Sequence, residues 1–151
     1  MSNLQIDKPR RVEAVSYAGP EPTHSVLVGY GLWIFGFLGL HRFYYGKPFT
    51  GLLWLLTGGV FLIGWVIDFF LIPSMAREAE LRYTRGEVDY SLAWLLLIFL
   101  GLFGVHRFYL GKWITGIVWL CTGALCGFGL VYDFATLNEQ VNEVNVTAAR
   151  H

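Results

Sequence analysis

The sequence contains few charged residues and carries no net charge. Asp, Glu, Lys and Arg make up 15% of the 151 residues, whereas hydrophobic residues make up 55% and aromatic residues 17%. Typical soluble domains contain roughly 25% charged residues. A net charge of zero gives no overall field that would attract nucleic acid or an acidic substrate. The composition therefore predicts a membrane protein and no nucleic-acid partner.

Cysteine is also scarce, and the residue patterns of several enzyme classes are absent from the sequence. Cys121 and Cys126 lie five positions apart in one apolar run, so on a helix they face different sides and are poorly placed to form a disulfide. We interpret them as small buried apolar residues. The sequence contains no His-Glu-x-x-His motif, no acidic metal cluster and no nucleophile beside a base. We therefore expect no enzymatic activity, no cofactor and no bound metal.

Charged residues divide the chain into segments. A helix needs about 20 residues to cross the hydrocarbon core of a bilayer, at 1.5 Å for each residue. The alternation typical of membrane β-strands is missing, so we expect an all-α integral membrane protein with four transmembrane helices. No Asp, Glu, Lys or Arg occurs in residues 25–40, 48–67, 90–105 or 113–132.

The chain contains an internal repeat. The segment GLHRFYYGKPFTG at 39–51 returns as GVHRFYLGKWITG at 104–116, an offset of 65 positions. The same offset matches Trp54 with Trp119 and Asp68 with Asp133. Since each copy contains two apolar runs, both copies enter the membrane from the same side, as two tandem parallel helical hairpins.

The repeat and the charged segments predict five regions. No secretory signal precedes the first apolar run, so we expect that run to act as an uncleaved anchor. Pro73 is expected to end the second helix, and the C-terminal segment to extend the last one. The predicted regions are a polar N-terminal tail (1–24), a first hairpin (25–73), a polar and amphipathic link (74–90), a second hairpin (91–137) and a polar C-terminal tail (138–151).

The distribution of basic residues predicts the orientation. Cytoplasmic segments of membrane proteins carry an excess of Lys and Arg. We therefore expect a multi-pass protein of the inner cell membrane, with both termini in the cytoplasm and the two turns on the opposite side. The tails and link contain Lys8, Arg10, Arg11, Arg77, Arg82, Arg85 and Arg150, and the turns contain Arg42, Lys47, Arg107 and Lys112.

The repeated His-Arg-Phe-Tyr turn is the first candidate site. Its aromatic rings suit the membrane interface and its glycine suits the end of a helix, so turn formation alone accounts for most of the motif. The His-Arg pair remains unexplained. Because Arg offers a two-pronged donor to phosphate, the pair could bind an anionic lipid headgroup or a membrane protein partner. The candidate residues are His41, Arg42, Tyr44, Lys47, His106, Arg107, Tyr109 and Lys112.

Asp68 and Asp133 form the second candidate, an intramembrane acidic pair. An ionisable residue inside a membrane segment suggests function, although we favour a structural hydrogen bond to another helix. From Pro48 to Asp68 an unbroken helix would extend about 30 Å. We therefore expect Arg42 and Asp68 on opposite membrane faces, and the separation of His41 from Asp68 argues against a joint catalytic role.

The repeated unit resembles the TM-two domain family, whose hairpin carries a His- or Asp-Arg-Phe turn. The resemblance rests on Gly-x-His-Arg-Phe-Tyr-x-Gly-Lys between two apolar runs and on a final Asp-Phe, and it covers residues 26–72 and 92–137. The chain looks like a tandem, bacterial-type member. The resemblance implies a two-helix hairpin architecture, and it implies no reaction.

Three functions remain open. The first is a non-enzymatic membrane protein that scaffolds or regulates partner proteins or lipids through its two turns. The second is a small ion or solute transporter or channel subunit, for which Thr57 and Thr122 are nearly the only polar candidates along a path. The third, with the least support, is an enzyme acting on membrane lipids. Glycine-lined faces also suggest a homo-oligomer.

Overall fold

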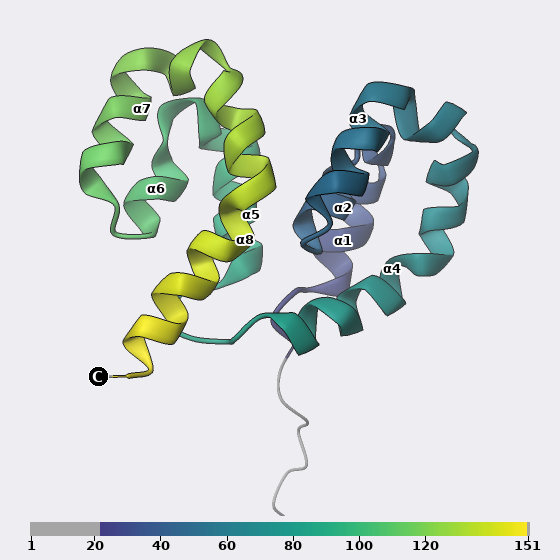
Figure 1. The fold of residues 1–151 in the computed structure, drawn as a ribbon, viewed down its shortest axis with the longest axis horizontal. Helices are drawn as coiled ribbons and strands as arrows, with labels where there is room; N and C mark the ends of the chain where they lie inside the picture. Colours follow the sequence, from purple (N-terminus) through teal and green to yellow (C-terminus); the bar gives the residue numbers. More distant parts are fainter. Residues whose placement is uncertain (1–21, 151) are drawn as a thin grey trace, which may run out of the picture.

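The computed structural model describes residues 22–150, and all its regular elements in that range are helical (Figure 1). Of the predicted N-terminal tail, residues 1–21 lie outside the described range. Each copy of the repeat contains the same five elements in the same order. They are α1 (Val26–Trp33), η1 (Gly36–Leu38), α2 (Leu40–Tyr44), α3 (Pro48–Phe61) and α4 (Ile63–Arg82), then α5 (Tyr90–Leu100), η2 (Gly101–Phe103), α6 (Val105–Tyr109), α7 (Trp113–Cys126) and α8 (Phe128–Ala148).

The second apolar run of each copy is not one straight helix, contrary to prediction. Five consecutive residues have positive φ angles, at 58–62 in the first copy and at 123–127 in the second. The regular part of α3 before this break has about ten residues, which span about 15 Å. Thr57 lies at the break, where its side-chain oxygen accepts a hydrogen bond from the Val60 amide at 3.0 Å. The chain then turns back along the same copy as α4.

The helices that follow these breaks are longer than expected. Pro73 lies inside α4, which runs through the proline to Arg82, so the prediction that Pro73 ends the helix is wrong. The expected extension of the last helix is confirmed, because α8 continues to Ala148. In Figure 1 both breaks lie at the top of the molecule, and the C-terminal ends of α4 and α8 lie at the bottom.

Side chains inside and outside the molecule show an unusual distribution. Within the described part of the chain, eleven polar or charged residues are buried, including His41, Asp68, His106 and Asp133, each with an exposed fraction of 0%. Large apolar side chains lie on the outside, and Phe49 is 90% exposed. Cys121 and Cys126 are also exposed, so their interpretation as buried residues is wrong. Among residues 22–150, no helix has both the length and the apolar character to cross a membrane.

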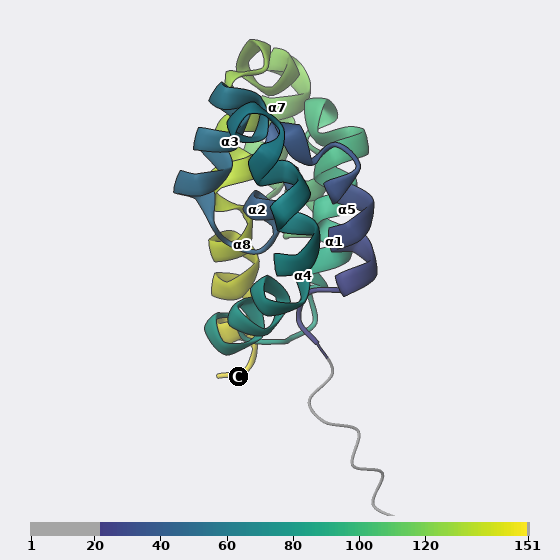
Figure 2. The same cartoon turned by 90° about the vertical axis from the view of Figure 1, so that its right-hand side faces the viewer.

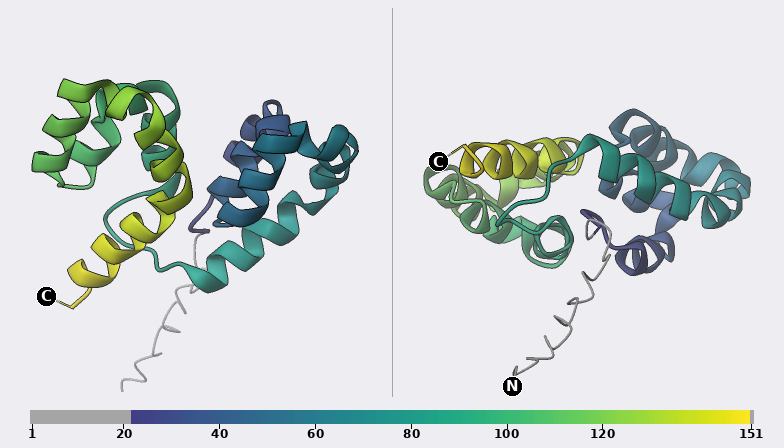
Figure 3. Two further views of the ribbon diagram at one scale, coloured as in Figure 1. Left: turned by 45° about the horizontal axis from the view of Figure 1, so that its top comes forward. Right: turned by 90° about the horizontal axis from the view of Figure 1, so that it is seen from below.

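The two copies share one core. The Tyr44 ring meets the edge of Trp94 at 5.8 Å between centroids, and Phe43 lies 6.1 Å from Phe134. Figure 1 and the left view of Figure 3 show α8 and α5 of the second copy on the side toward the first copy, and in Figure 2 the end of α4 lies below them. There the Tyr83 hydroxyl donates to a carboxylate oxygen of Glu139 at 3.1 Å. The link and α8 are therefore in direct contact.

Candidate functional site

In the first copy, the His-Arg pair of the turn and the aspartate of the following helix form one buried cluster. The Asp68 carboxylate on α4 accepts from His41 Nε2 at 2.7 Å and from Arg42 Nε at 2.7 Å. A second hydrogen bond, from Arg42 Nη2 to Asp68 Oδ1, makes the arginine contact bidentate. The guanidinium carbon also lies 3.7 Å from the centroid of the Trp54 ring. Four residues from α2, α3 and α4 therefore meet at one point.

The second copy repeats the cluster. Asp133 on α8 accepts from His106 Nε2 at 2.8 Å and from Arg107 Nε at 3.2 Å, with a second bond from Arg107 Nη2. The Arg107 guanidinium carbon lies 3.6 Å from the centroid of Trp119. Gln140 adds a contact, because its Nε2 lies 3.5 Å from Asp133 Oδ1. The 65-residue offset thus preserves an arrangement in space as well as in sequence.

These clusters contradict the expectation that Arg42 and Asp68 lie on opposite membrane faces. That expectation assumed one unbroken helix from Pro48 to Asp68. Because the chain reverses at residues 58–62, α4 passes back beside α2 and brings Asp68 to the arginine. The separation of His41 from Asp68, inferred from the same assumption, is wrong for the same reason.

The hydrogen bonds define the proton positions on the histidines. A carboxylate can only accept, so each Nε2 carries the hydrogen when the ring is neutral. Nδ1 is then an acceptor, and in both His41 and His106 it is buried without a hydrogen-bond partner. Within residues 22–150, no group of three or more His, Cys, Asp or Glu side chains is placed to hold a metal ion. The contacts with Asp68 and Asp133 thus account for the Nε2 atoms of His41 and His106 as hydrogen-bond donors.

The clusters cross-link the helices of each copy. Removing one member of a buried ion pair typically costs about 3–5 kcal/mol, because the remaining charge is left unpaired. Stacking of an arginine on an aromatic ring adds about 0.5–2 kcal/mol. His41 Nε2 and the Arg42 guanidinium are thus engaged within the protein. Their repetition has a structural explanation, which the turn alone did not provide.

The tyrosines of the turns also have partners within the chain. The hydroxyl of Tyr44 lies 2.7 Å from the Ser91 Oγ atom, which brings the first turn to the start of α5. The Tyr109 hydroxyl accepts from the Asp89 amide at 3.0 Å. Tyr44 is fully buried. Both rings therefore connect the turns to the segment that joins the copies.

The lysines of the turns lie beside charged residues at the C-terminal ends of α4 and α8. We call this region the charged end of the molecule. Lys47 Nζ donates to Glu78 at 2.5 Å, and Arg82 Nη1 donates to the Gly46 carbonyl at 2.8 Å. The lysine hydrogen bond holds the pKa of Glu78 below its usual range. In the second copy Lys112 Nζ lies 3.6 Å from Glu143. Turn and link are therefore neighbours, contrary to the expectation that they lie on opposite sides of the membrane.

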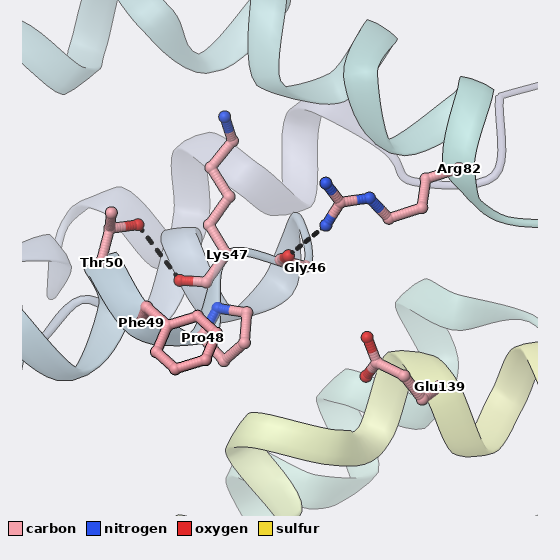
Figure 4. A pocket seen from close by; sticks show the side chains of 7 residues that line it. All are labelled: Gly46, Lys47, Pro48, Phe49, Thr50, Arg82 and Glu139. Carbon is pink, nitrogen blue, oxygen red and sulfur yellow. Dashed lines mark hydrogen bonds between the residues drawn. The ribbon is translucent and has the colours of Figure 1, made fainter.

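A cleft of 490 Å³ opens beside the first turn. Figure 4 shows its lining, with Arg82 reaching from the end of α4 to the Gly46 carbonyl and Glu139 of α8 facing the cleft. Residues from three separate parts of the chain meet there. The lining residues are Gly46, Lys47, Pro48, Phe49, Thr50, Arg82 and Glu139.

Sequence reasoning missed a polar junction between the copies. Asn138 on α8 donates to the Phe43 and Tyr44 carbonyls at 3.2 and 2.8 Å and accepts from the Trp94 indole at 2.7 Å. His24 Nε2 lies 3.3 Å from the same Asn138 oxygen. Burial lowers the pKa of His24 from 6.5 to about 4. The only signal in the sequence was a break in the repeat. At an offset of 65 residues, Asn138 has Pro73 as its equivalent and His24 has Asp89.

Comparison with known proteins gives a family to this geometry. The sequence matches the TM2 domain twice, over residues 22–70 and 86–135. The chain belongs to the TM2 domain family. The two matched segments contain both histidines, both arginines and both aspartates of the buried clusters. The resemblance inferred from the repeated motif is therefore confirmed.

Relatives in the TM2 domain family share only part of their length with this chain. A TM2 domain-containing protein of Dictyostelium discoideum is 50% identical over 60 residues, which cover 39% of each chain. A second from the same organism is 57% identical over 47 residues, 30% of this chain and 34% of the relative. TM2 domain-containing protein 1 of Mus musculus is 40% identical over 72 residues, 48% of this chain and 32% of the relative. These relatives are eukaryotic and lend no support to the expected bacterial type. No solved structure matches the chain.

Proposed function

We propose that this TM2 domain protein is a non-enzymatic integral membrane protein that scaffolds or regulates partner proteins or lipids at its charged end. The observation that carries the membrane assignment is the extent of apolar surface on the outside of the molecule. Charged and polar side chains pair in the interior, while large apolar side chains such as Leu27 and Phe70 are 81% and 76% exposed. A hydrocarbon environment stabilises this arrangement, since exposed apolar surface of this extent is unfavourable in water.

The proposed contact surface differs in detail from the one suggested by the sequence. His41, Arg42 and Tyr44 are buried, and so are His106 and Arg107. Their proposed role is to hold the helices of each copy together. Contacts with lipid headgroups or partners are then made by the turn residues that lie beyond the clusters. The proposed contact residues are Lys47 and Lys112 together with their neighbours at the ends of α4 and α8.

We propose that all charged segments lie on one side of the membrane. The Lys47–Glu78 and Arg82–Gly46 contacts support placing the first turn and the link together, and the Lys112–Glu143 contact supports the same for the second turn and the end of α8. The concentration of Lys and Arg in these segments favours the cytoplasmic face of the inner membrane. Both termini would then face the cytoplasm.

Labelling of single cysteines tests this arrangement. In a chain with Cys121→Ser and Cys126→Ser, Lys47→Cys and Glu80→Cys report on the turn and the link, and a membrane-impermeant maleimide is applied to inside-out and right-side-out vesicles. We expect both cysteines to react in the inside-out vesicles only. Reaction of the two in vesicles of opposite orientation would show that turn and link lie on different sides. Extraction of the unmodified protein by alkaline carbonate would contradict its integral membrane character.

Association with partners is tested by gentle purification followed by native mass spectrometry. Lys47→Ala combined with Lys112→Ala is compared with the unmodified chain, and Thr136→Ala, at a half-buried position of α8, serves as a control. We expect a lipid or protein that accompanies the unmodified chain to be lost from the lysine variant and retained by the control. Retention in all three would exclude the turns as the contact surface.

A further inference from the structure

We propose that the cleft beside the first turn binds the zwitterionic headgroup of a phospholipid, in which a phosphate is joined to a group that ends in a primary amine. This inference rests on the proposed membrane function and adds a ligand class to it. A zwitterion needs a cation for its phosphate and an anion for its amine, held at a fixed separation. The lining of the cleft contains one carboxylate, Glu139, and two basic groups, Arg82 and Lys47, of which Lys47 is already paired with Glu78.

Arg82 is the phosphate-binding group. Its guanidinium has five N–H donors, and the contacts in the described structure use only some of them. Nη1 donates to the Gly46 carbonyl at 2.8 Å, and Nη2 lies 3.9 Å from Glu78. These contacts hold the planar fork at the edge of the cleft, where its other donors suit phosphate oxygens. Fixing the fork before binding lowers the entropy cost of holding a ligand.

Glu139 is the amine-binding group. Its carboxylate accepts from the hydroxyl of Tyr83, a ring that is only 6% exposed. Tyr83 packs directly against Gly46, because a Cβ atom at that glycine would lie 2.2 Å from the tyrosine hydroxyl oxygen. The turn, the tyrosine and the carboxylate thus form one connected arrangement. Figure 4 shows the carboxylate facing the cleft from α8, on a different helix from Arg82.

The rest of the cleft suits the glycerol and acyl part of a lipid. Phe49 lies at the cleft and is 90% exposed, and Pro48 lies beside it. Aromatic rings are enriched at the level where headgroups meet hydrocarbon. A soluble zwitterion would leave the Phe49 ring uncovered, whereas the acyl chains of a lipid would cover it. The apolar rim therefore favours a phospholipid over a small soluble ligand.

The second copy provides a natural comparison. One of its clefts, also 490 Å³, is lined by Leu110, Lys112, Glu143, Val144, Thr147 and Ala148. Another, of 470 Å³, is lined by residues 111–115, the equivalents of residues 46–50. Thr147 stands 65 positions after Arg82, so neither of these clefts has an arginine at the equivalent place. The Glu143 carboxylate lies 3.6 Å from Lys112. We therefore assign the zwitterion site to the first cleft alone.

Competition between lipids of defined charge tests the proposal. Purified protein is placed in nanodiscs of phosphatidylcholine that contain equal amounts of phosphatidylethanolamine and phosphatidylglycerol, and retained lipids are quantified by native mass spectrometry. We expect phosphatidylethanolamine to be retained at least threefold more often than its share of the mixture. Glu139→Gln should abolish that enrichment and raise phosphatidylglycerol, because the phosphate site survives without the amine site. Arg82→Gln should abolish both, and Glu87→Gln, at an exposed position of the link, should change neither.

Two results would overturn the inference. One is an unmodified chain without enrichment of phosphatidylethanolamine over phosphatidylcholine, and the other is enrichment that persists in both Arg82→Gln and Glu139→Gln. Thermal unfolding of each variant, compared with Glu87→Gln, shows whether a loss of lipid reflects a loss of fold. Neither result touches the proposed function, which depends on the labelling and extraction experiments. A chain extracted by carbonate would instead remove the membrane function on which the site rests.

Discussion

The two copies of the repeat agree in their interior and differ where they meet each other. Both contain a His-Arg-Asp cluster stacked on a tryptophan, and both reverse the chain through five residues with positive φ. At the junction, Asn138 of the second copy has Pro73 as its equivalent in the first. A repeated interior indicates that each copy depends on the same cross-link. The differences show which residues join the copies.

The largest expected effect comes from breaking a cluster. Asp68→Asn leaves the Arg42 guanidinium buried without its counter-charge, and we expect a loss of about 3–5 kcal/mol in the free energy of unfolding. Asp133→Asn should act in the same direction on the second copy. Denaturant unfolding of both variants in detergent measures the losses. If the losses caused by Asp68→Asn and Asp133→Asn differ by more than a few kcal/mol, the two copies are not equivalent.

A double variant separates the ion pair from general disturbance of the site. Arg42→Gln combined with Asp68→Asn removes both charges and should be more stable than the sum of the two single losses implies, because no buried charge remains alone. Strict additivity of the two losses would show that the residues act independently. The contact distances of 2.7 Å predict strong coupling.

The next effect depends on pH and on one copy only. Burial lowers the pKa of His24 to about 4, against 6.5 for the free side chain. Between these values the unfolded chain binds the proton first, so stability falls as pH falls from about 6.5 to about 4. The shift corresponds to about 3 kcal/mol over that window. In the second copy, the position equivalent to His24 holds Asp89, so that copy has no corresponding histidine.

Measuring unfolding from pH 7 to pH 4 in His24→Gln and in the unmodified chain tests this difference. The change in stability that disappears in the variant belongs to His24, because all other titrating groups are common to both chains. Equal pH dependence in the two chains would show that the imidazole is accessible to protons in the folded state.

Two equivalent glycines should respond differently to the same substitution. Gly46 and Gly111 have φ angles of +73° and +72°, so alanine costs each about 1–2 kcal/mol through backbone strain. A Cβ atom at Gly46 also meets Tyr83, whereas nothing lies within 4 Å of one at Gly111. We therefore expect Gly46→Ala to be the more destabilising in thermal unfolding. Equal losses would show that Tyr83 moves aside at no cost.

The comparison of the copies also explains what sequence alone could predict. The repeat and its polar residues were visible because identical side chains recur at a constant offset. The partners of Asp68 and Asp133 were missed because the chain reversal uses Val60, Phe61 and Leu62 in a conformation that such residues rarely adopt. The Gly58–Gly59 pair is a local turn signal, but it does not indicate that the next three residues also adopt positive φ. The junction at Asn138 was missed because its meaning depends on a contact with the other copy, 94 residues away.

The smallest expected effect lies at the turn lysines, where the copies differ in geometry. Lys47 donates to Glu78 at 2.5 Å, whereas Lys112 and Glu143 are 3.6 Å apart, with the glutamate side chain 73% exposed. Exposed pairs contribute about 0.2–1 kcal/mol, and salt screens them. Double-mutant cycles with Lys47→Ala and Glu78→Ala, and with Lys112→Ala and Glu143→Ala, measure the two couplings. We expect the first coupling to be the larger and to shrink in 1 M salt.

Since the lowered pKa of Glu78 favours its charged form in the folded chain, the first coupling should also be lost as pH falls below the usual glutamate range. A second coupling as large as the first would mean that a more exposed, longer contact can match a close one at this charged end of the molecule.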